Sequence, residues 1–261
     1  MHISFEGQTA FVTGAGQGIG RATALAFARA GADVALCDLD QSGLDATAAD
    51  IRAIGRRACP LLADISSENE VRAMVASAYQ AFGRIDMLVN NAGISGSKTP
   101  LTELDMREFD RVLGVNLRGT VLCAKYVLPH MLEAGRGSVV NIASTLGRMG
   151  SAGKVPYVAS KWAVIGVTQS LALEVASRGV RVNAVAPGYT MTDMMRSNRE
   201  AQAAREGRTY EEAVAGVAAL SPQNRIVSAD EVASVVLWLS SDAAISIHGQ
   251  TVNANAALFM N

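Results

Sequence analysis

Short runs of hydrophobic residues alternate with longer segments of mixed polarity along most of the chain. Six runs predict β-strands, at residues 9–13, 33–37, 57–63, 86–90, 138–142 and 180–186, and a seventh strand is expected at 250–253. Most of these runs are apolar throughout, which is typical of strands in a parallel sheet that is buried on both faces. The segments between them predict helices near 18–30, 41–54, 67–82, 103–134 and 156–178.

This alternation of strand and helix predicts an α/β fold, a Rossmann-like doubly wound, mostly parallel seven-stranded sheet with helices on both faces. The alternation is interrupted once, at about residues 189–222, where methionine, arginine and alanine are frequent. We interpret this segment as a helical lid over a substrate site. The sequence contains no linker, repeat or low-complexity segment, so residues 1–261 are expected to form a single domain.

Charge and residue usage narrow the classes of function. A formal net charge of −1 gives no basic field that would attract nucleic acid or an anionic membrane. We find neither a transmembrane run nor a signal-peptide pattern, and we expect a cytoplasmic protein. Cys37, Cys59 and Cys123 lack C-x-x-C spacing and are predicted to be buried, reduced thiols. The three histidines are far apart in the sequence, so no metal site is expected.

A glycine-rich loop follows the first predicted strand and leads into a helix. Backbone without side chains can approach a pyrophosphate, and a helix N-terminus offers free N–H groups and a positive dipole end. A glycine turn that only packs the helix against the strand is the alternative. The position of the loop favours phosphate binding, with contacts from Gly14, Gln17, Gly18, Ile19 and Gly20.

Asp38 ends the second predicted strand and favours NAD(H) over NADP(H). A carboxylate at this point can accept hydrogen bonds from the hydroxyls of the adenosine ribose, and it would repel a 2′-phosphate. No lysine or arginine stands at Ala15, Gln17 or Leu39 to neutralise such a phosphate. The alternative is a solvated turn aspartate, like its neighbour Asp40.

A serine, a tyrosine and a lysine are candidates for acid–base chemistry. Ser144 follows the fifth predicted strand, and Tyr157 and Lys161 lie four residues apart at the start of a helix, on one face. The ordinary tyrosine pKa of about 10 is too high for proton exchange near neutrality. The Lys161 ammonium and an oxidised nicotinamide ring can lower that pKa through opposite charge. Ser144 can then hold a substrate oxygen against Tyr157.

These motifs stand in a characteristic order, with Asn116 between the glycine loop and Ser144, and Pro187 and Gly188 after Lys161. Their order and spacing resemble those of the short-chain dehydrogenase/reductase family, over about residues 7–253. The resemblance implies an NAD-dependent oxidoreductase that acts on CH–OH groups, by hydride transfer between a secondary alcohol and a ketone. It also implies a homotetramer.

The resemblance implies a role for each catalytic candidate. Tyr157 would give a proton in carbonyl reduction and take one in alcohol oxidation. Lys161 would lower the pKa of Tyr157 and bind the nicotinamide ribose, Ser144 would orient the substrate, and Asn116 would hold a water that links Lys161 to a proton relay. The other implied coenzyme contacts are Leu39, Asp64, Ile65, Asn91, Ala92, Gly93, Pro187, Gly188, Thr190 and Thr192.

Two positions depart from the family pattern. Thr190 stands where the family usually has an aliphatic residue, next to the expected carboxamide contact of Thr192. Near the C-terminus the family often has Val-Asp-Gly-Gly, whereas residues 252–256 read Val-Asn-Ala-Asn-Ala. The second departure affects the terminal turn and its subunit contacts rather than the catalytic residues.

Several alternatives stay open at this point. A non-catalytic NAD-binding regulator would not need all of Asn116, Ser144, Tyr157 and Lys161, and a sugar-nucleotide epimerase would need a larger C-terminal part. The substrate is either a 3-hydroxyacyl or 3-oxoacyl thioester, or a polyol, sugar or cyclic alcohol. For a thioester, the lid methionines Met191, Met194 and Met195 would contact the acyl chain, and Arg196 and Arg199 would lie near its phosphates.

Overall fold

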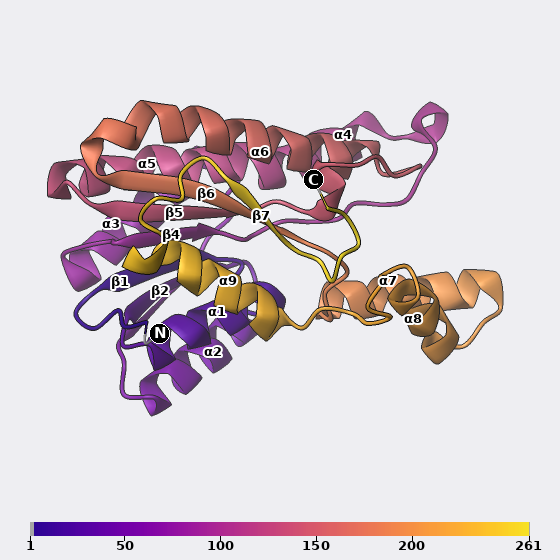
Figure 1. The fold of residues 1–261 in the computed structure, drawn as a ribbon, viewed down its shortest axis with the longest axis horizontal. Helices are drawn as coiled ribbons and strands as arrows, with labels where there is room; N and C mark the ends of the chain where they lie inside the picture. The colour runs from indigo at the N-terminus through magenta and orange to yellow at the C-terminus, as the bar shows by residue number, and fades with distance from the viewer. Residues whose placement is uncertain (1–2, 261) are drawn as a thin grey trace.

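Within residues 3–260, which the computed structural model describes, the strands form one seven-stranded sheet in the order β3-β2-β1-β4-β5-β6-β7 (Figure 1). Every neighbouring pair is parallel. The predicted doubly wound fold is confirmed, and the strand order reverses at β1. The strands are β1 (Thr9–Thr13), β2 (Asp33–Asp38), β3 (Ala58–Leu62), β4 (Met87–Asn90), β5 (Gly137–Ile142), β6 (Val180–Pro187) and β7 (Thr251–Ala254).

Helices cover both faces of the sheet (Figure 1). One face packs against α1 (Gly18–Arg29), α2 (Gln41–Ala53) and α9 (Ala229–Ser240). The other packs against α3 (Glu68–Phe82), α5 (Thr120–Ala134) and α6 (Val155–Val175). Short 3₁₀ turns occupy Leu101–Glu103, Thr145–Gly147, Ala176–Arg178 and Asp242–Ala244.

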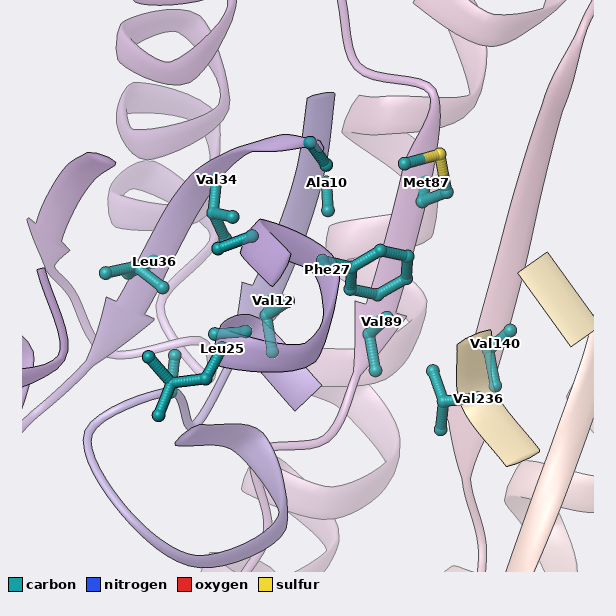
Figure 2. Close-up of a cluster of buried hydrophobic side chains, with 14 of the residues drawn as sticks. Ala10, Val12, Leu25, Phe27, Val34, Leu36, Met87, Val89, Val140 and Val236 are labelled. Carbon is teal, nitrogen blue, oxygen red and sulfur yellow. The ribbon is translucent and has the colours of Figure 1, made fainter. Parts of the chain in front are cut away.

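The core explains why the strand segments are apolar throughout. In Figure 2, Val12 of β1 and Val34 of β2 lie beside Phe27 of α1, and Val140 of β5 lies beside Val236 of α9. All of these side chains are fully buried. Because helices also cover the opposite face, the residues between them in sequence are buried as well, and no alternation of polarity remains.

The predicted helix at 103–134 is wrong as a continuous element. Helix α4 (Met106–Leu113) passes into a π-helical stretch, Gly114–Gly119, before α5 begins. Gly119 faces the sheet so closely that a Cβ there would lie 2.5 Å from Ile65 Cδ1. Such wide turns inside helices often occur at functional sites, and this one contains Asn116.

Helix α9 was not predicted, although its first turn carries a strong start signal. Ser228 Oγ accepts a hydrogen bond from Glu231 N at 3.1 Å, and Ser228 N donates to Glu231 Oε2 at 2.7 Å. This reciprocal capping box satisfies two backbone donors that a helix N-terminus leaves free.

The lid, residues 189–222, contains two helices, α7 (Asp193–Glu206) and α8 (Tyr210–Ala218). They stand out from the body of the molecule on one side (Figure 1). A backbone clasp closes the base of this segment, because Val227 N donates to Tyr189 O and Met191 N donates to Val227 O, both at 2.9 Å. The inner face of the lid buries Met195, Ala203, Ala213 and Val217.

The cysteines and histidines that the structure describes have packing roles. Cys37 and Cys123 are buried, and burial raises the pKa of each thiol. The predicted burial of Cys59 is wrong in degree, because it lies on the half-covered edge strand β3. His248 accepts from Val182 N at 3.2 Å and bonds Ala172 O at 2.7 Å, and His130 stacks on Tyr79.

Residues 3–260 contain neither a metal-binding cluster nor a membrane-spanning helix. No group of three or more histidine, cysteine, aspartate or glutamate side chains is arranged to hold a metal ion. No helix in the same range is both long and apolar enough to cross a membrane.

Candidate active site

A cleft of about 1500 Å³ opens at the carboxyl ends of the strands, between the sheet and the lid. Parallel α/β sheets place their ligands at this edge. Of the predicted site residues, the cleft is lined by Gly14, Gln17, Gly18, Ile19, Asp38, Leu39, Asp64, Ile65, Asn91, Ala92, Gly93, Ser144, Tyr157, Lys161, Pro187, Gly188, Thr190 and Thr192. Gly20 and Asn116 are not part of this lining, and both are buried behind it.

The glycine loop is built for close backbone approach. Gly14 and Gly18 have φ values of 64° and 54°, in the left-handed region that favours glycine. A Cβ on Gly20 would lie 1.9 Å from Gly14 O, so this glycine is required for packing. Gly20 thus has the packing role that the sequence offered as the alternative, and its contact with coenzyme stays a prediction.

Partly buried hydrogen bonds fix the glycine loop to the residues that directly follow strand β4. Thr13 Oγ1 accepts from both Asn91 N and Ala92 N at 3.1 Å. The Asn91 side chain donates to Thr13 O at 2.9 Å and to Gly14 O at 3.0 Å. These bonds hold the ends of two neighbouring strands together at the floor of the cleft.

Asp38 is held in one orientation at the end of β2. Its Oδ2 accepts from Gly16 N at 2.8 Å, and its Oδ1 accepts from Leu39 N at 2.7 Å and from Asp40 N at 3.1 Å. Gly16 is required for this approach, because a Cβ there would lie only 3.0 Å from Oδ2. The carboxylate is thus positioned by the backbone and faces the cleft, unlike a freely solvated turn aspartate.

Ser144, Tyr157 and Lys161 come together in the same cleft. Tyr157 lies in the first turn of α6, directly after Pro156, and Lys161 follows one turn later. The Lys161 Nζ lies 5.8 Å from the centre of the Tyr157 ring and donates to Ile142 O at 2.7 Å. Ser144 caps the next 3₁₀ turn, with Oγ accepting from Leu146 N at 3.1 Å.

Burial sets the protonation of this group. It raises the pKa of the Tyr157 phenol above its ordinary value, and a hydrogen bond with Ser144 acts in the opposite direction. Burial also lowers the pKa of Lys161 to about 8. The lowered Tyr157 pKa expected from the sequence is therefore not supplied by the residues of this chain alone, because removal from water outweighs the hydrogen bond with Ser144.

Asn116 lies beneath the cleft floor. Its side chain accepts from Ile94 N at 2.8 Å and donates to Ile94 O and Ser160 Oγ, both at 3.0 Å. A Cβ on Gly93 would lie 3.1 Å from Asn116 Oδ1 and 3.5 Å from Lys161 Nζ. The missing side chain of Gly93 therefore leaves a small space between the amide and the ammonium.

Two residues that contact each other at the strand ends were not identified from the sequence, Thr145 and Asn255. Thr145 Oγ1 donates to Pro187 O at 3.0 Å, and Asn255 Nδ2 lies 3.5 Å from the same hydroxyl. Asn255 belongs to the C-terminal run that departs from the family pattern. It packs closely on Gly188, because a Cβ added to Gly188 would lie 2.9 Å from Asn255 Cα. The departure from the family pattern marks Asn255 in the sequence, but the sequence does not show that Asn255 packs against the strand ends.

The lid supplies only some of the predicted contacts. Met194, Met195 and Arg199 line the cleft, together with Arg205 and Arg208, two further arginines of the lid. Met191 and Arg196 do not belong to the lining, and Arg196 is exposed. Arg196 does not face the cleft together with Arg199, because α7 turns its inner face to the cleft at Met195 and Arg199, which lie one helical turn apart. A contact of Arg196 with phosphates outside the cleft stays a prediction.

The sequence model of the family described as short chain dehydrogenase matches residues 8–203. This chain belongs to the short-chain dehydrogenase family. Its members include enzymes of different substrate classes, so membership establishes an oxidoreductase that acts on alcohol or keto groups and leaves the substrate open.

Individual short-chain dehydrogenases resemble the chain over nearly its full length. It is 39% identical to the cis-4-hydroxycyclohexanecarboxylate dehydrogenase of Sinomonas cyclohexanicum, covering 95% of each chain. It is 36% identical to the 3-oxoacyl-[acyl-carrier-protein] reductase of Thermotoga maritima, covering 98% of this chain and 99% of the relative. A solved structure of NAD⁺-bound xylitol dehydrogenase superimposes with a TM-score of 0.91 at 33% identity, covering 96% of this chain and 98% of the other.

Proposed function

We propose that this short-chain dehydrogenase uses NAD(H) to interconvert a secondary alcohol and a ketone, with Asn116, Ser144, Tyr157 and Lys161 as its catalytic group. The observation that carries the proposal is that one cleft is lined both by the oriented carboxylate of Asp38 and by Tyr157 with Ser144 and Lys161. A non-catalytic regulator has no use for the second group.

The residues at the glycine loop fit a dinucleotide. Backbone N–H groups at the start of α1 point to where a pyrophosphate would lie, and the helix adds its positive dipole end. Asp38 would accept the ribose hydroxyls and repel a 2′-phosphate. The cationic residues that line the cleft belong to other segments, at Lys98, Arg111, Lys154, Lys161, Arg199, Arg205 and Arg208. NAD(H) is therefore favoured over NADP(H).

The protein moves a proton while the coenzyme carries the hydride. Oxidised coenzyme, when bound beside Tyr157, would supply the acceptor for the hydride that leaves the carbinol carbon. The Tyr157 phenolate takes the hydroxyl proton, and the O–H electron pair becomes the second bond of the ketone. Ser144 holds the reacting oxygen by a hydrogen bond. In reduction the Tyr157 phenol, which burial keeps protonated, returns that proton.

Lys161 and Asn116 prepare the tyrosine for oxidation. The Lys161 ammonium favours the phenolate by opposite charge and would also bind the nicotinamide ribose. We assign the space beside Gly93, between Asn116 and Lys161, to a water that carries the proton onward. The other predicted coenzyme contacts that line the cleft, from Asp64 and Ile65 to Thr190 and Thr192, would frame the coenzyme.

Two substrate classes fit this site, an acyl thioester and a free alcohol that is either cyclic or a polyol. The names of two relatives indicate a ring-bearing hydroxy acid or a 3-oxoacyl thioester, and that of the xylitol dehydrogenase indicates a polyol. The sequence-based preference for a thioester now rests on Arg199, Arg205 and Arg208, because Arg196 lies outside the cleft lining. The segment at 189–222 would act as the lid of a single-domain enzyme for either class.

We extend the proposal to a homotetramer. Helix α6 carries apolar residues around its whole circumference, and Trp162 and Leu173 on it are 51% and 84% exposed. A helix of this kind is usually buried on all sides, so a second copy would cover these residues. The cytoplasmic location predicted from the sequence belongs to the same proposal.

The experiment is a substrate screen that follows NADH absorbance with NAD⁺ or NADP⁺. The panel contains cyclic hydroxy acids, 3-hydroxyacyl thioesters and polyols, and the variant Asp38→Ala is measured in parallel. We expect NAD⁺ to be preferred and the preference to narrow in the variant, because both the ribose bonds and the repulsion are lost. Equal catalytic efficiency of the wild type with both coenzymes contradicts the NAD assignment.

A further inference from the structure

Four of the cationic side chains that line the cleft come from three separate segments. Lys98 lies on the loop after β4, Lys154 directly precedes α6, and Arg199 and Arg205 lie on the lid helix α7. Lys154 is only three residues from Tyr157 in the sequence. The positive charges therefore gather beside the reaction centre rather than at the Asp38 end.

Lys154 is held by neutral partners. Its Nζ donates to Ser95 Oγ at 2.9 Å and to Gly96 O at 2.8 Å, with Ser95 O more distant at 3.5 Å. Burial lowers the pKa of Lys154, and the nearby charges of Lys98, Arg199 and Arg205 act in the same direction, while Glu108 opposes them. The last effect is limited because Glu108 is already paired with Arg111 at 2.8 Å.

Arg199 also lacks a compensating charge. Its guanidinium donates to the neutral side chain of Gln202. The Arg199 Nε is buried and has no hydrogen-bond partner among the described residues. Arg208, by contrast, pairs with Glu206 at 3.4 Å. A buried donor without an acceptor is unfavourable, and an incoming oxygen ligand would relieve it.

Carboxylates in the cleft do not offset this cluster. Asp38 and Asp64 lie at the ends of β2 and β3, and Glu206 is already paired with Arg208. Asp110 and Asp193 also line the cleft, and within the described residues neither of them forms an ion pair with any of the four cations. A positive surface therefore remains where a substrate would project from Tyr157.

We propose that Lys98, Lys154, Arg199 and Arg205 form an oxyanion site that binds a carboxylate or phosphate of the substrate while its alcohol carbon lies at Tyr157. This inference rests on the proposed function, since it names the substrate class of the same site. Arginine and lysine donors to an oxyanion form charge-assisted hydrogen bonds, the strongest kind in proteins. The substrate is thus an anionic secondary alcohol, and closing the lid brings Arg199 and Arg205 onto its charge.

The experiment compares matched pairs of substrates that differ only in the anion. One pair is 4-hydroxycyclohexanecarboxylate and its carboxamide, and the other is a 3-hydroxyacyl-CoA and the same acyl group on N-acetylcysteamine. Catalytic efficiency is measured for the wild type, Lys154→Gln and Arg199→Gln. Arg196→Gln is the control, because it removes an exposed charge from the same helix α7 outside the cleft lining.

We expect the wild type to prefer the anionic member of one pair. Lys154→Gln and Arg199→Gln should each reduce that preference by about 10- to 100-fold, the strength of a hydrogen bond to a charged group, mainly through KM. Arg196→Gln should leave it unchanged. A loss in the first pair identifies a carboxylate, and a loss in the second a phosphate.

Two results overturn the inference, and they are distinguishable. If the neutral members are oxidised as well as the anionic ones, or if the two variants keep the wild-type preference, the oxyanion site is refuted while the dehydrogenase function stands. If no member of either pair, and no alcohol of the wider screen, is oxidised with either coenzyme, the proposed function itself fails.

Discussion

The coenzyme side of the cleft and the lid are built in opposite ways. Every residue of β1 is buried, whereas α7 buries only Met195 and Ala203 among its 14 residues, and α8 buries only Ala213 and Val217 among 9. Regions with few buried contacts open locally at low free energy. The side of the cleft with the proposed catalytic residues is thus rigid, and the proposed substrate lid is adjustable.

Their hydrogen bonds differ in the same way. Asn91 and Thr13 join strands that are 78 residues apart in the sequence. In the lid, Gln202 donates to Glu206 at 2.9 Å within one helix. A change in the first region therefore propagates to distant parts of the fold, and a change in the second stays local.

The largest effect is expected from Tyr157→Phe, which removes the transferable proton on the rigid side and keeps the ring. Turnover should fall by about 10²- to 10⁴-fold, the usual contribution of general acid–base catalysis. NADH binding, followed by fluorescence titration, should be nearly unchanged. Near-normal turnover would show that the proton comes from another group.

A matched pair of glycine substitutions tests the contrast in stability. Gly20→Ala should lower the free energy of unfolding by about 3 kcal/mol, as overpacking does, because its Cβ would collide with Gly14 O. Gly216→Ala, in lid helix α8, meets nothing closer than 3.7 Å, the distance to the Arg208 side chain. It should be neutral or stabilising by up to about 1 kcal/mol. Urea unfolding measures both, and equal losses would remove the distinction between the two regions.

Lys161→Met should reveal the cost of a buried ammonium. Burial lowers the pKa of Lys161 from 10.5 to about 8, so between these values the unfolded chain binds more protons than the folded one. The wild type should therefore gain stability relative to Lys161→Met as pH rises through this window. The gain is on the order of 3 kcal/mol, at about 1.4 kcal/mol per pKa unit.

Unfolding of both proteins at pH 7 and pH 10 provides the measurement. The prediction concerns the difference in unfolding free energy between the wild type and Lys161→Met at each pH, because the other groups titrate alike in both proteins. A difference that does not change with pH would mean that Lys161 keeps its ordinary pKa in the folded protein.

The smallest effect on stability is expected in the lid. Met195→Ala should lower the free energy of unfolding by about 1 kcal/mol or less, because the lid opens locally before the body unfolds. Met87→Ala in β4, a fully buried site of the same residue type, should cost about 2–5 kcal/mol. The lid variant should instead raise KM. Similar losses at both positions would mean that the lid belongs to the cooperative core.

The sequence was informative where local pattern and long-range structure agree. The strand runs were found because a sheet covered on both faces leaves nearly continuous apolar segments, as in β1 and β4. The fold class and most of the cleft lining followed from this, since parallel strands bring Gly14, Asp38, Asn91 and Ser144 to one edge. The roles of these residues in catalysis and coenzyme binding stay predictions.

What the sequence did not show depends on packing between distant segments. The π-helical turn at Gly114–Gly119 depends on how closely the chain passes Ile65, which no helical periodicity reports. In the sequence Lys154 resembles any polar residue before a helix. Its hydrogen bonds to Ser95 and Gly96 hold it at the cleft that Arg199 also lines. Helix α9 is different, because its capping box at Ser228 and Glu231 was readable and went unused.

The order of the strands also determines how the chain can be assembled during synthesis. β1, β2 and β3 are complete after residue 62, and β4, β5, β6 and β7 are then added in sequence order on the other side of β1. When strands pair in the order in which they are synthesised, growth in one direction leaves one new edge open at a time. The first edge, β3, carries Pro60, and proline at an edge discourages pairing with another chain. The nascent protein therefore exposes its one growing edge to the next strand of its own sequence.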